Sequence, residues 1–599
     1  MAFHRASLRE TVKLILQKVG LLPAARRFRR FIKPELTREQ AHYQRFVRFK
    51  RQYGRLLGPL SNHVSHDQKK VLVISIGFPQ VEIELGLLKG LELAGYVPVV
   101  LITEDYDHEL LQAYYHLAAI EEVLIWSEFS DPLDLDAAEA VIKQYGSVEK
   151  LLEFECAGAR VGKFAVSTAL RRHRLGSIDL ESSEERQILL KYLASAVASV
   201  AAAQRIAQQV RPELVLYVDR VYTPAGELID VCLANGMTAI RWDKGHKNNA
   251  LVLKRYTQEN RDEHAESLSE ETWQLIRDME WTEAQREQLH QELLSSYVKG
   301  DWYSQAATQY NKRLLDGDTI RQHLGLDPAK KTAIIFPHIL WDSSFFFGED
   351  LFRDYEEWLV ETVLAACKND QVNWVIKIHP AHVGKNVADG FQGDPAEVIV
   401  LRKHLSHLPP HVFTIPAESE INTFSLFELM DYCLTVRGTI GMEAARLGIP
   451  VLTAGTGRYD RRGFTIDSDS REEYLEKVAA IQDIPRLSPA QRELAERFAY
   501  GIFVLRPFPV RTVTLEYHDQ SGVNKTEINL KSKEDWYSAP DLRAFIQWLT
   551  GSNQADFLMP LSGVYPSETI VPKHGNGQSI HSTNADTQVG TASSKLLLR

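Results

Sequence analysis

Continuous apolar runs that alternate with helical patterns occur in two separate parts of this chain. Runs of this kind are typical of strands that are buried on both faces of a parallel sheet. In the first part they lie at residues 71–76, 97–102, 214–218 and 238–242, and in the second part at 333–336, 374–378, 432–436 and 450–453. Because helical patterns separate them, we predict two α/β domains, each a doubly wound Rossmann-like unit.

The length of the chain supports the same division. A single hydrophobic core stops growing near about 250–300 residues, and this chain has 599. We expect two Rossmann-like domains that face a cleft, one over 67–320 with a helical insertion and one over 321–505. A helical extension over 1–66, a C-terminal extension over 506–574 that packs back on the domains, and a disordered polar tail over 575–599 complete the predicted organisation.

Charge and cysteine usage narrow the partners and the compartment. The net charge of -10 argues against nucleic acid as a partner, because phosphate-backbone binding usually needs a basic excess. The four cysteines are widely spaced, so neither a disulfide framework nor a zinc site is expected. The most apolar stretch, residues 193–203, is about half of the ~20 residues that a bilayer span needs. The N-terminus lacks a signal-peptide pattern, so we expect a cytoplasmic protein.

The N-terminal extension is basic and amphipathic. Apolar residues recur at helical spacing over 8–19, and a cluster of arginines follows over 26–30. Such a segment suits an anionic membrane surface, so residues 5–55 could hold the protein peripherally at the inner face of the cytoplasmic membrane. The alternative is a helical hairpin that packs on the first domain and exposes its basic face to water.

The strongest motif joins the end of a predicted strand to a helix and consists of Arg437, Gly438, Thr439, Gly441 and Glu443. Backbone N–H groups lack partners at the start of a helix, and glycines let a phosphate approach them closely. A guanidinium at this point would add a bidentate positive charge, and the glutamate could accept hydrogen bonds from ribose hydroxyls. The alternative is an ordinary strand-to-helix turn with an acidic residue near the helix start.

A second motif, Lys377, His379 and Pro380, follows another strand of the second domain. Ligands bind at the carboxyl ends of strands in open parallel sheets, and the proline restricts the backbone of the histidine. The imidazole could therefore contact a departing nucleotide, unless it is satisfied locally. Arg458 follows a later strand and could reach the same phosphates. Residues 336–338 and 342–344 also follow a strand of this domain.

Candidates for a catalytic base lie in the first domain. Asp219 comes just after the apolar run at 214–218, and His246 follows the run at 238–242. Either could deprotonate an acceptor hydroxyl, and a structural hydrogen bond is the alternative for each. The two D-x-D-like pieces, at 134–136 and 467–469, do not follow strands. We therefore predict no metal site and no cofactor.

These motifs resemble those of a known family. The K-x-H-P strand end at 377–380, the R-G-T-x-G-x-E turn at 437–443 and the G-I-P-V piece at 448–451 resemble the capsule polysaccharide biosynthesis glycosyltransferases. That group includes the Kdo transferases and, more distantly, the CDP-glycerol glycerophosphotransferases. The resemblance implies a GT-B architecture and a nucleotide contact at His379, Pro380, Thr439 and Gly441.

The implied function is transfer of a sugar from a nucleotide-activated donor to a glycan or lipid-linked glycan of capsule or lipopolysaccharide type. A phosphopolyol transferase of the CDP-glycerol type and a nucleotide-sugar 2-epimerase are alternatives within the enzyme class. A non-catalytic glycan-binding scaffold of a polysaccharide export complex is the alternative from another class. The donor sugar and its nucleotide stay open.

Overall fold

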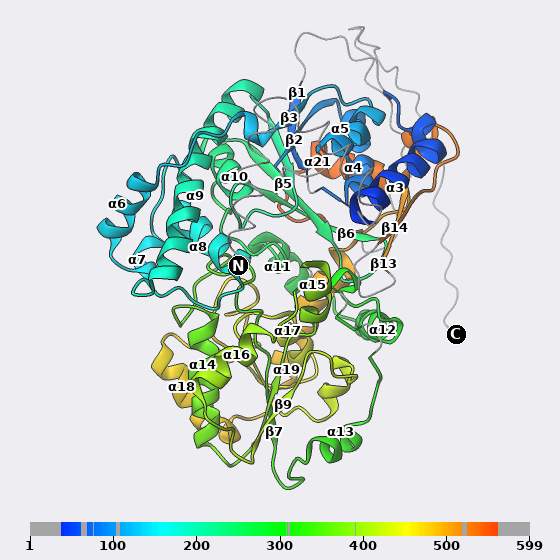
Figure 1. Cartoon of the computed structure of the whole chain (residues 1–599). Coiled ribbons are helices and arrows are strands. Elements are labelled where there is room, and N and C mark those ends of the chain that lie inside the picture. The colour runs from blue at the N-terminus through cyan, green and yellow to red at the C-terminus, as the bar shows by residue number, and fades with distance from the viewer. Residues whose placement is uncertain are drawn as a thin grey trace, which may run out of the picture.

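A computed structural model describes residues 37–560, apart from 61–68, 76, 79, 104–107, 307, 310–311, 390 and 518–523. The amphipathic pattern over 8–19, the arginine cluster over 26–30 and the polar tail over 575–599 lie outside the described residues. The predicted fold class is confirmed: the chain forms two mainly parallel α/β sheets with helices around them (Figure 1).

The first sheet has seven strands in the order β12-β6-β5-β4-β1-β2-β3. The run from β3 to β5 is parallel, while β6 and β12 add antiparallel edges. The strands are β1 (Lys69–Ser75), β2 (Tyr96–Ile102), β3 (Val123–Ile125), β4 (Leu214–Tyr217), β5 (Thr238–Lys244), β6 (Ala250–Tyr256) and β12 (Phe508–Pro509). Because the chain fills one side of β1 with β2 and β3 before it crosses to β4, the topology switches between β1 and β4.

Helices cover this sheet and extend beyond it. The helices beside the strands are α4 (Val81–Leu93), α5 (His108–Leu117) and α10 (Ala225–Ala234). A helical block precedes β4 and comprises α6 (Leu135–Tyr145), α7 (Val148–Leu151), α8 (Val161–His173) and α9 (Ser183–Val210). We call α6 to α9 the helical insertion; it lies on the left of Figure 1, above the second domain.

The second sheet has five parallel strands in the order β11-β10-β7-β8-β9. They are β7 (Thr332–Ile335), β8 (Asn373–Lys377), β9 (Val412–Ile415), β10 (Tyr432–Thr435) and β11 (Val451–Thr453). Their helices are α14 (Tyr355–Lys368), α15 (Ala381–Asp389), α16 (Ala396–His404), α17 (Thr439–Ala445), α18 (Arg471–Ala479) and α19 (Pro489–Tyr500). Here the topology switches between β7 and β10, which places residues 336–350 and 436–443 beside each other.

The segments outside the sheets connect and cover the two domains. Between the sheets the chain forms α11 (Glu270–Asp278), α12 (Glu283–Lys299) and α13 (Gly317–Leu324). After α19 it returns to the first domain as β12, the hairpin β13 (Val513–Tyr517) and β14 (Asn524–Ile528), α20 (Asp535–Ser538) and α21 (Pro540–Gly551). Gly90 of α4 lets α21 approach closely, because a Cβ there would lie 2.9 Å from the Phe545 ring.

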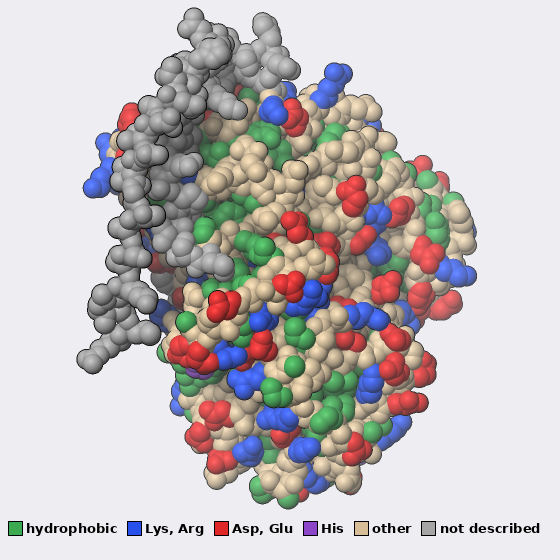
Figure 2. All heavy atoms as spheres, turned by 180° about the vertical axis from the view of Figure 1, so that it is seen from behind, with side chains coloured by type: hydrophobic (Ala, Val, Ile, Leu, Met, Phe, Trp, Pro, Cys, Tyr) green, Lys and Arg blue, Asp and Glu red, His purple; other side chains and the backbone are tan. Residues whose placement is uncertain are grey.

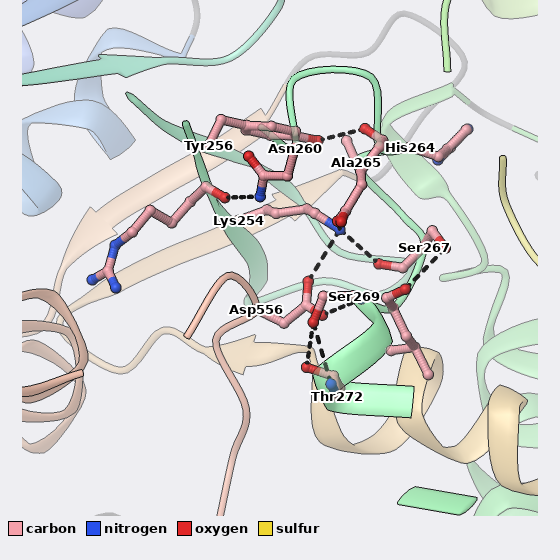
Figure 3. A network of polar contacts seen from close by, with 12 residues as sticks. Lys254, Tyr256, Asn260, His264, Ala265, Ser267, Ser269, Thr272 and Asp556 are labelled. Carbon is pink, nitrogen blue, oxygen red and sulfur yellow. Dashed lines mark hydrogen bonds and ion pairs between the residues drawn. The ribbon is translucent and has the colours of Figure 1, made fainter. Parts of the chain in front are cut away.

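A buried carboxylate ties this return segment to the start of the interdomain connection (Figure 3). Asp556 accepts the Ser269 N–H at 2.7 Å and lies 3.4 Å from Lys254 Nζ, which also donates to the Ser267 carbonyl. Burial acts to raise the pKa of Asp556, but Lys254 and Arg506 lower it to about 2. The carboxylate is thus charged at neutral pH and joins β6, the segment before α11 and the C-terminal extension.

The described part of the N-terminal extension, α3 (Thr37–Tyr53), packs on the first domain. Phe46, Phe49 and Tyr53 are buried, and Arg45 forms a two-point ion pair with Glu82 of α4, at 2.8 and 2.6 Å. For α3 the structure therefore shows the packed alternative, and membrane contact by residues 5–55 stays a prediction. In Figure 2 acidic and basic side chains are interspersed over the coloured part of the face shown. Among the described helices, none combines the length and the apolar character needed to cross a bilayer.

Candidate functional site

The carboxyl ends of the two sheets meet at the seam between the domains. Tyr222, which follows β4, donates its hydroxyl to Asp342 Oδ1 at 2.9 Å and accepts the Ser343 N–H at 3.0 Å. Burial raises the pKa of Asp219, and the negative charge of Asp342 adds to this. The switch points of both sheets therefore open onto one interdomain seam.

The segment after β7, residues 338–350, spans this seam. Ser167 of α8 donates to the Ser344 carbonyl at 2.8 Å, and the rings of Phe164 and Phe346 stack at 5.2 Å. Ser343, Phe345 and Phe347 have φ values of 55°, 66° and 69°. Such left-handed backbone costs about 1–3 kcal/mol at a residue other than glycine and persists only where contacts impose it. We call residues 338–350 the bridging segment.

Arg437 holds the bridging segment in place. Its guanidinium donates to the carbonyls of Phe346 at 2.8 Å and Glu349 at 3.0 Å, and it pairs with Asp350. Arg437 is only 3% exposed, and both terminal nitrogens of its guanidinium are occupied by the protein itself. This corrects the expectation of a bidentate contact with phosphate. What Arg437 supplies to the seam is an ordered loop and a nearby positive charge.

Three half-buried histidines lie at the seam: His264, His338 and His379. In each ring one nitrogen accepts a backbone N–H. His338 Nε2 accepts from Arg437 at 3.1 Å, His379 Nδ1 from Ala381 at 3.2 Å, and His264 Nδ1 from Glu266 at 3.0 Å. A neutral imidazole carries its proton on the other nitrogen. Each ring is thereby left with one N–H group to donate to a ligand.

The electrostatic environment keeps these rings neutral. Burial, with smaller effects from His382, Lys385 and Lys377, lowers the pKa of His379 to about 3. Burial and the charge of Arg437 bring the pKa of His338 well below its usual range, and His379 and Arg458 add to this. The pKa of His264 is also well below its usual range, because of burial and the charges of Arg458 and Arg437. We call these three rings the histidine cluster: neutral N–H donors in a positive field, which suits an anion.

The turn between β10 and α17 borders the same region. Gly438 is the N-cap residue of α17, and no side chain caps this helix end. Gly438 and Thr439 are half-buried. Gly441 permits close packing, because a Cβ there would lie 2.0 Å from the hydroxyl oxygen of Tyr459. That hydroxyl donates to the Gly438 carbonyl at 2.7 Å, and this hydrogen bond holds the turn in place.

Glu443 differs from its expected role as a ribose ligand. The carboxyl group is 1% exposed and accepts the Tyr297 hydroxyl at 2.7 Å. Burial raises its pKa to about 7. It therefore points into the core between α17 and α12, away from any nucleotide at the seam.

Lys377 and Arg458 are also held by the protein. Lys377 is 2% exposed and donates to the Ile378 carbonyl at 3.1 Å; burial lowers its pKa to about 7. Arg458 donates to the Arg437 carbonyl at 3.1 Å and pairs with Glu266. Pro380 is half-buried between His379 and the start of α15. Of these three residues, Arg458 contributes to the site through its charge on the histidine cluster.

The two first-domain candidates for a base, Asp219 and His246, differ in their exposure. Asp219 is exposed at the seam and accepts the Val221 N–H at 3.1 Å, with its pKa raised mainly by desolvation. His246 is 3% exposed, its Nε2 lies 2.8 Å from Glu292, and its ring packs against Trp302 and Phe503. His246 is therefore a packing residue without access to substrate, which corrects its expected role as a base.

Of the histidine cluster, His338 was only a weaker candidate within residues 336–338, and His264 was not predicted. His338 follows a strand end, and that position was its only sequence signal. His264 lies in the irregular segment after β6 and belongs to no motif. Within the residues that the structure describes, no three His, Cys, Asp or Glu side chains are grouped to hold a metal ion.

Comparisons with known proteins find structural neighbours only. No protein-family model matches the chain, and neither does any curated protein. KpsC, a β-Kdo 2,4 transferase from Thermosulfurimonas dismutans, is 16% identical with a TM-score of 0.32, over 53% of this chain and 84% of that one. UDP-GlcNAc 2-epimerase from Neisseria meningitidis, bound to UDP-GlcNAc, is 13% identical with a TM-score of 0.29, over 73% and 96%.

A putative UDP-N-acetylglucosamine 2-epimerase from Listeria monocytogenes is 11% identical with a TM-score of 0.27, over 82% of this chain and 100% of that one.

Proposed function

We propose that this chain is a glycosyltransferase that binds a nucleotide-activated sugar at the histidine cluster and transfers the sugar to a growing cell-surface polysaccharide. The observation that carries the proposal is the cluster itself. Three neutral imidazoles at the seam each keep an N–H donor. His338, at the switch point of the second sheet, and His264 lie in the field of Arg437 and Arg458, and His379 follows the neighbouring strand β8. Phosphate oxygens are the natural partners of such donors.

The α17 turn adds to this anion site. Its first N–H groups have no capping side chain, and the glycine at 438 lets a phosphate approach the backbone. Thr439 and Pro380 lie half-buried at the two strand ends that would flank the nucleotide. In this arrangement the donor's phosphates lie between the start of α17 and His379. His338 donates a hydrogen bond to the same phosphates.

Asp219 then acts as the base. Because desolvation raises the pKa of its carboxyl, this carboxylate takes up a proton more readily than an ordinary aspartate does. It accepts the proton of an acceptor hydroxyl, whose oxygen forms a bond to the anomeric carbon of the sugar. The bond from that carbon to the donor phosphate breaks, and the phosphate leaves with the electron pair. The histidine N–H groups and the arginine charges stabilise the leaving phosphate without a metal ion.

A binding experiment tests this proposal before the sugar is known. Thermal unfolding is recorded with CMP, CDP, UDP and GDP in turn. A nucleotide at 100 times its dissociation constant adds about 2.7 kcal/mol of stability, so one of the four is expected to raise the melting temperature. Mass spectrometry of products made from the matching nucleotide sugars then identifies the transferred group. A melting temperature unmoved by all four would favour a non-catalytic scaffold, and release of an isomerised donor without any transfer would favour an epimerase.

A further inference from the structure

A groove of about 720 Å³ runs between the helical insertion and the second domain. On one side it is lined by the loop 146–149 and the segment 173–180. On the other side it is lined by parts of α14 and α16 and by Phe391. Figure 1 shows α7 and α8 above α14 and α16 in this region. The volume lies within the roughly 300–1,000 Å³ that is usual for binding sites of small molecules.

The inner end of the groove adjoins the proposed reaction site. Trp341 and His382 line it; Trp341 directly precedes Asp342, and the His382 N–H donates to the His379 carbonyl at 3.3 Å. His382 is fixed by Glu397 of α16, at 2.8 Å. The backbone that carries Asp342 and His379 therefore also forms the inner wall of the groove.

The walls of the groove combine apolar surface with charges of both signs. Phe391 and Ile399 are 38% and 53% exposed there. The Arg174 guanidinium lies 4.1 Å from the centre of the Phe391 ring and covers one of its faces. Lys403 is an exposed cation of the same wall.

Carboxylates from both domains line the groove, Glu185 from the insertion and Glu356 from α14. Burial raises the pKa of Glu356 on α14; the charge of Asp354 and, more weakly, that of Glu185 act in the same direction, while Lys403 and Arg353 oppose them. Since Glu185 belongs to the insertion, each wall contributes a carboxylate, and Arg353 and Lys403 lie among them. A polyanion would meet both carboxylates, and a lipid tail would leave them without hydrogen bonds. A neutral sugar instead has hydroxyls to donate to carboxylates and to accept from Arg and Lys, and apolar C–H faces to pack on a ring.

We propose that this groove binds the acceptor as a short, uncharged oligosaccharide segment, whose terminal hydroxyl reaches Asp219 past Trp341. The inference rests on the proposed function and adds the class and location of the acceptor. The outer sugars lie on Phe391 and Ile399, and their hydroxyls bond to Glu185, Glu356 and Lys403. Because the two walls belong to different domains, a bound acceptor also holds the domains together across the seam.

The test compares two substitutions at similarly exposed aliphatic positions. Ile399→Trp fills the groove, and Leu275→Trp lies on α11 outside it, where Leu275 is 57% exposed. Both variants and the wild type are applied to an array of defined bacterial surface oligosaccharides, neutral and acidic. The nucleotide-induced rise in melting temperature is measured for all three proteins.

The wild type is expected to retain at least one neutral oligosaccharide. I399W should weaken that binding about tenfold or more, as the loss of a central contact does at an interface, while L275W should bind it like the wild type. The rise in melting temperature should be equal in all three proteins. If I399W does not fold, Phe391→Ala takes its place and should show the same loss.

Three results would overturn the inference: no oligosaccharide retained by the wild type, retention of acidic ones alone, or equal binding by I399W and L275W. Each of them can occur while the nucleotide still stabilises the protein, in which case the proposed function stands and the acceptor groove fails. Loss of the nucleotide effect in the wild type would instead remove the proposed function.

Discussion

The two sheets have the same kind of switch point. The switch points differ in the charge around them and in whether the protein's own side chains fill them. Beside β1 of the first sheet, the Tyr115 hydroxyl lies 2.5 Å from both Ser75 Oγ and Glu84 Oε2. Glu84 is fully buried. Beside β7 and β10 of the second sheet lie neutral imidazoles and the charges of two arginines. The first switch point is filled by the protein's own acid and hydroxyl groups, whereas the second keeps hydrogen-bond donors for a ligand.

This difference bears on which domain would bind the proposed nucleotide donor. An anion beside Glu84 would have to displace a hydrogen-bonded chain and would meet carboxyl groups, while an anion at the histidine cluster meets N–H donors. The comparison therefore supports the proposal that the nucleotide binds in the second domain. In the proposed function the first domain supplies the base, Asp219.

The largest expected effect tests whether the first domain supplies the base while the second domain binds the donor. Asp219→Asn keeps the shape of the side chain but removes the base, so turnover should fall by about 10²–10⁴-fold. The melting-temperature shift with the stabilising nucleotide should stay unchanged, because the donor site lies in the other domain. Equal turnover by D219N and the wild type, measured by product mass spectrometry, would remove Asp219 from the mechanism.

The next effect concerns donor affinity. His338→Ala together with His379→Ala removes two hydrogen bonds to a charged group, each worth about 1.5–3 kcal/mol, so nucleotide affinity should fall about 100-fold or more. Isothermal titration calorimetry measures this loss. Tyr115→Phe, at the first switch point, is the matched control and should bind the nucleotide like the wild type. If Y115F lost affinity and the double variant kept it, the assignment of domains would be reversed.

A smaller effect is expected from pH. A bound phosphate raises the pKa of His379 from its low value of about 3, so binding takes up protons and affinity should rise as the pH falls. The gain is limited to about tenfold per pH unit for one proton. The nucleotide titrates as well, so the informative quantity is the difference between the wild type and His379→Gln. A wild-type profile no steeper than that of H379Q would show that His379 does not respond to the ligand.

The smallest effect concerns the filled switch point of the first domain. Burial raises the pKa of Glu84 to about 8 in the folded protein, above its unfolded value. The folded state therefore binds more protons between the unfolded pKa and about 8, and stability falls as the pH rises through that window. Glu84→Gln should flatten this decline by up to about 1.4 kcal/mol per pH unit. Denaturant unfolding at several pH values measures it, and parallel curves for the two proteins would contradict a protonated Glu84.

Much of the fold could be predicted from the sequence, because buried parallel strands leave continuous apolar runs. The runs at 71–76 and 374–378 became β1 and β8. By contrast, β12 has only two residues, and its partner β6 precedes the whole second sheet in the sequence. Such a short strand leaves no local pattern that could be detected.

The site was harder to predict, because partners that are distant in sequence decide what a polar side chain does. Arg437 looked free, but Asp350 lies 87 residues earlier and binds it. His246 looked available, but Glu292 and Trp302 enclose it. The place of His379 at the seam could be predicted, because a strand end puts it there whatever its neighbours are. Position in the topology was thus a better guide than residue type.

The most direct test of the central claim is a crystal structure of the protein with the nucleotide that stabilises it. The account predicts that a phosphate oxygen lies within hydrogen-bonding distance of His338 Nδ1 and His379 Nε2, beside the start of α17. A nucleotide bound instead beside Ser75 and Glu84, or one whose phosphates contact neither histidine, would contradict it.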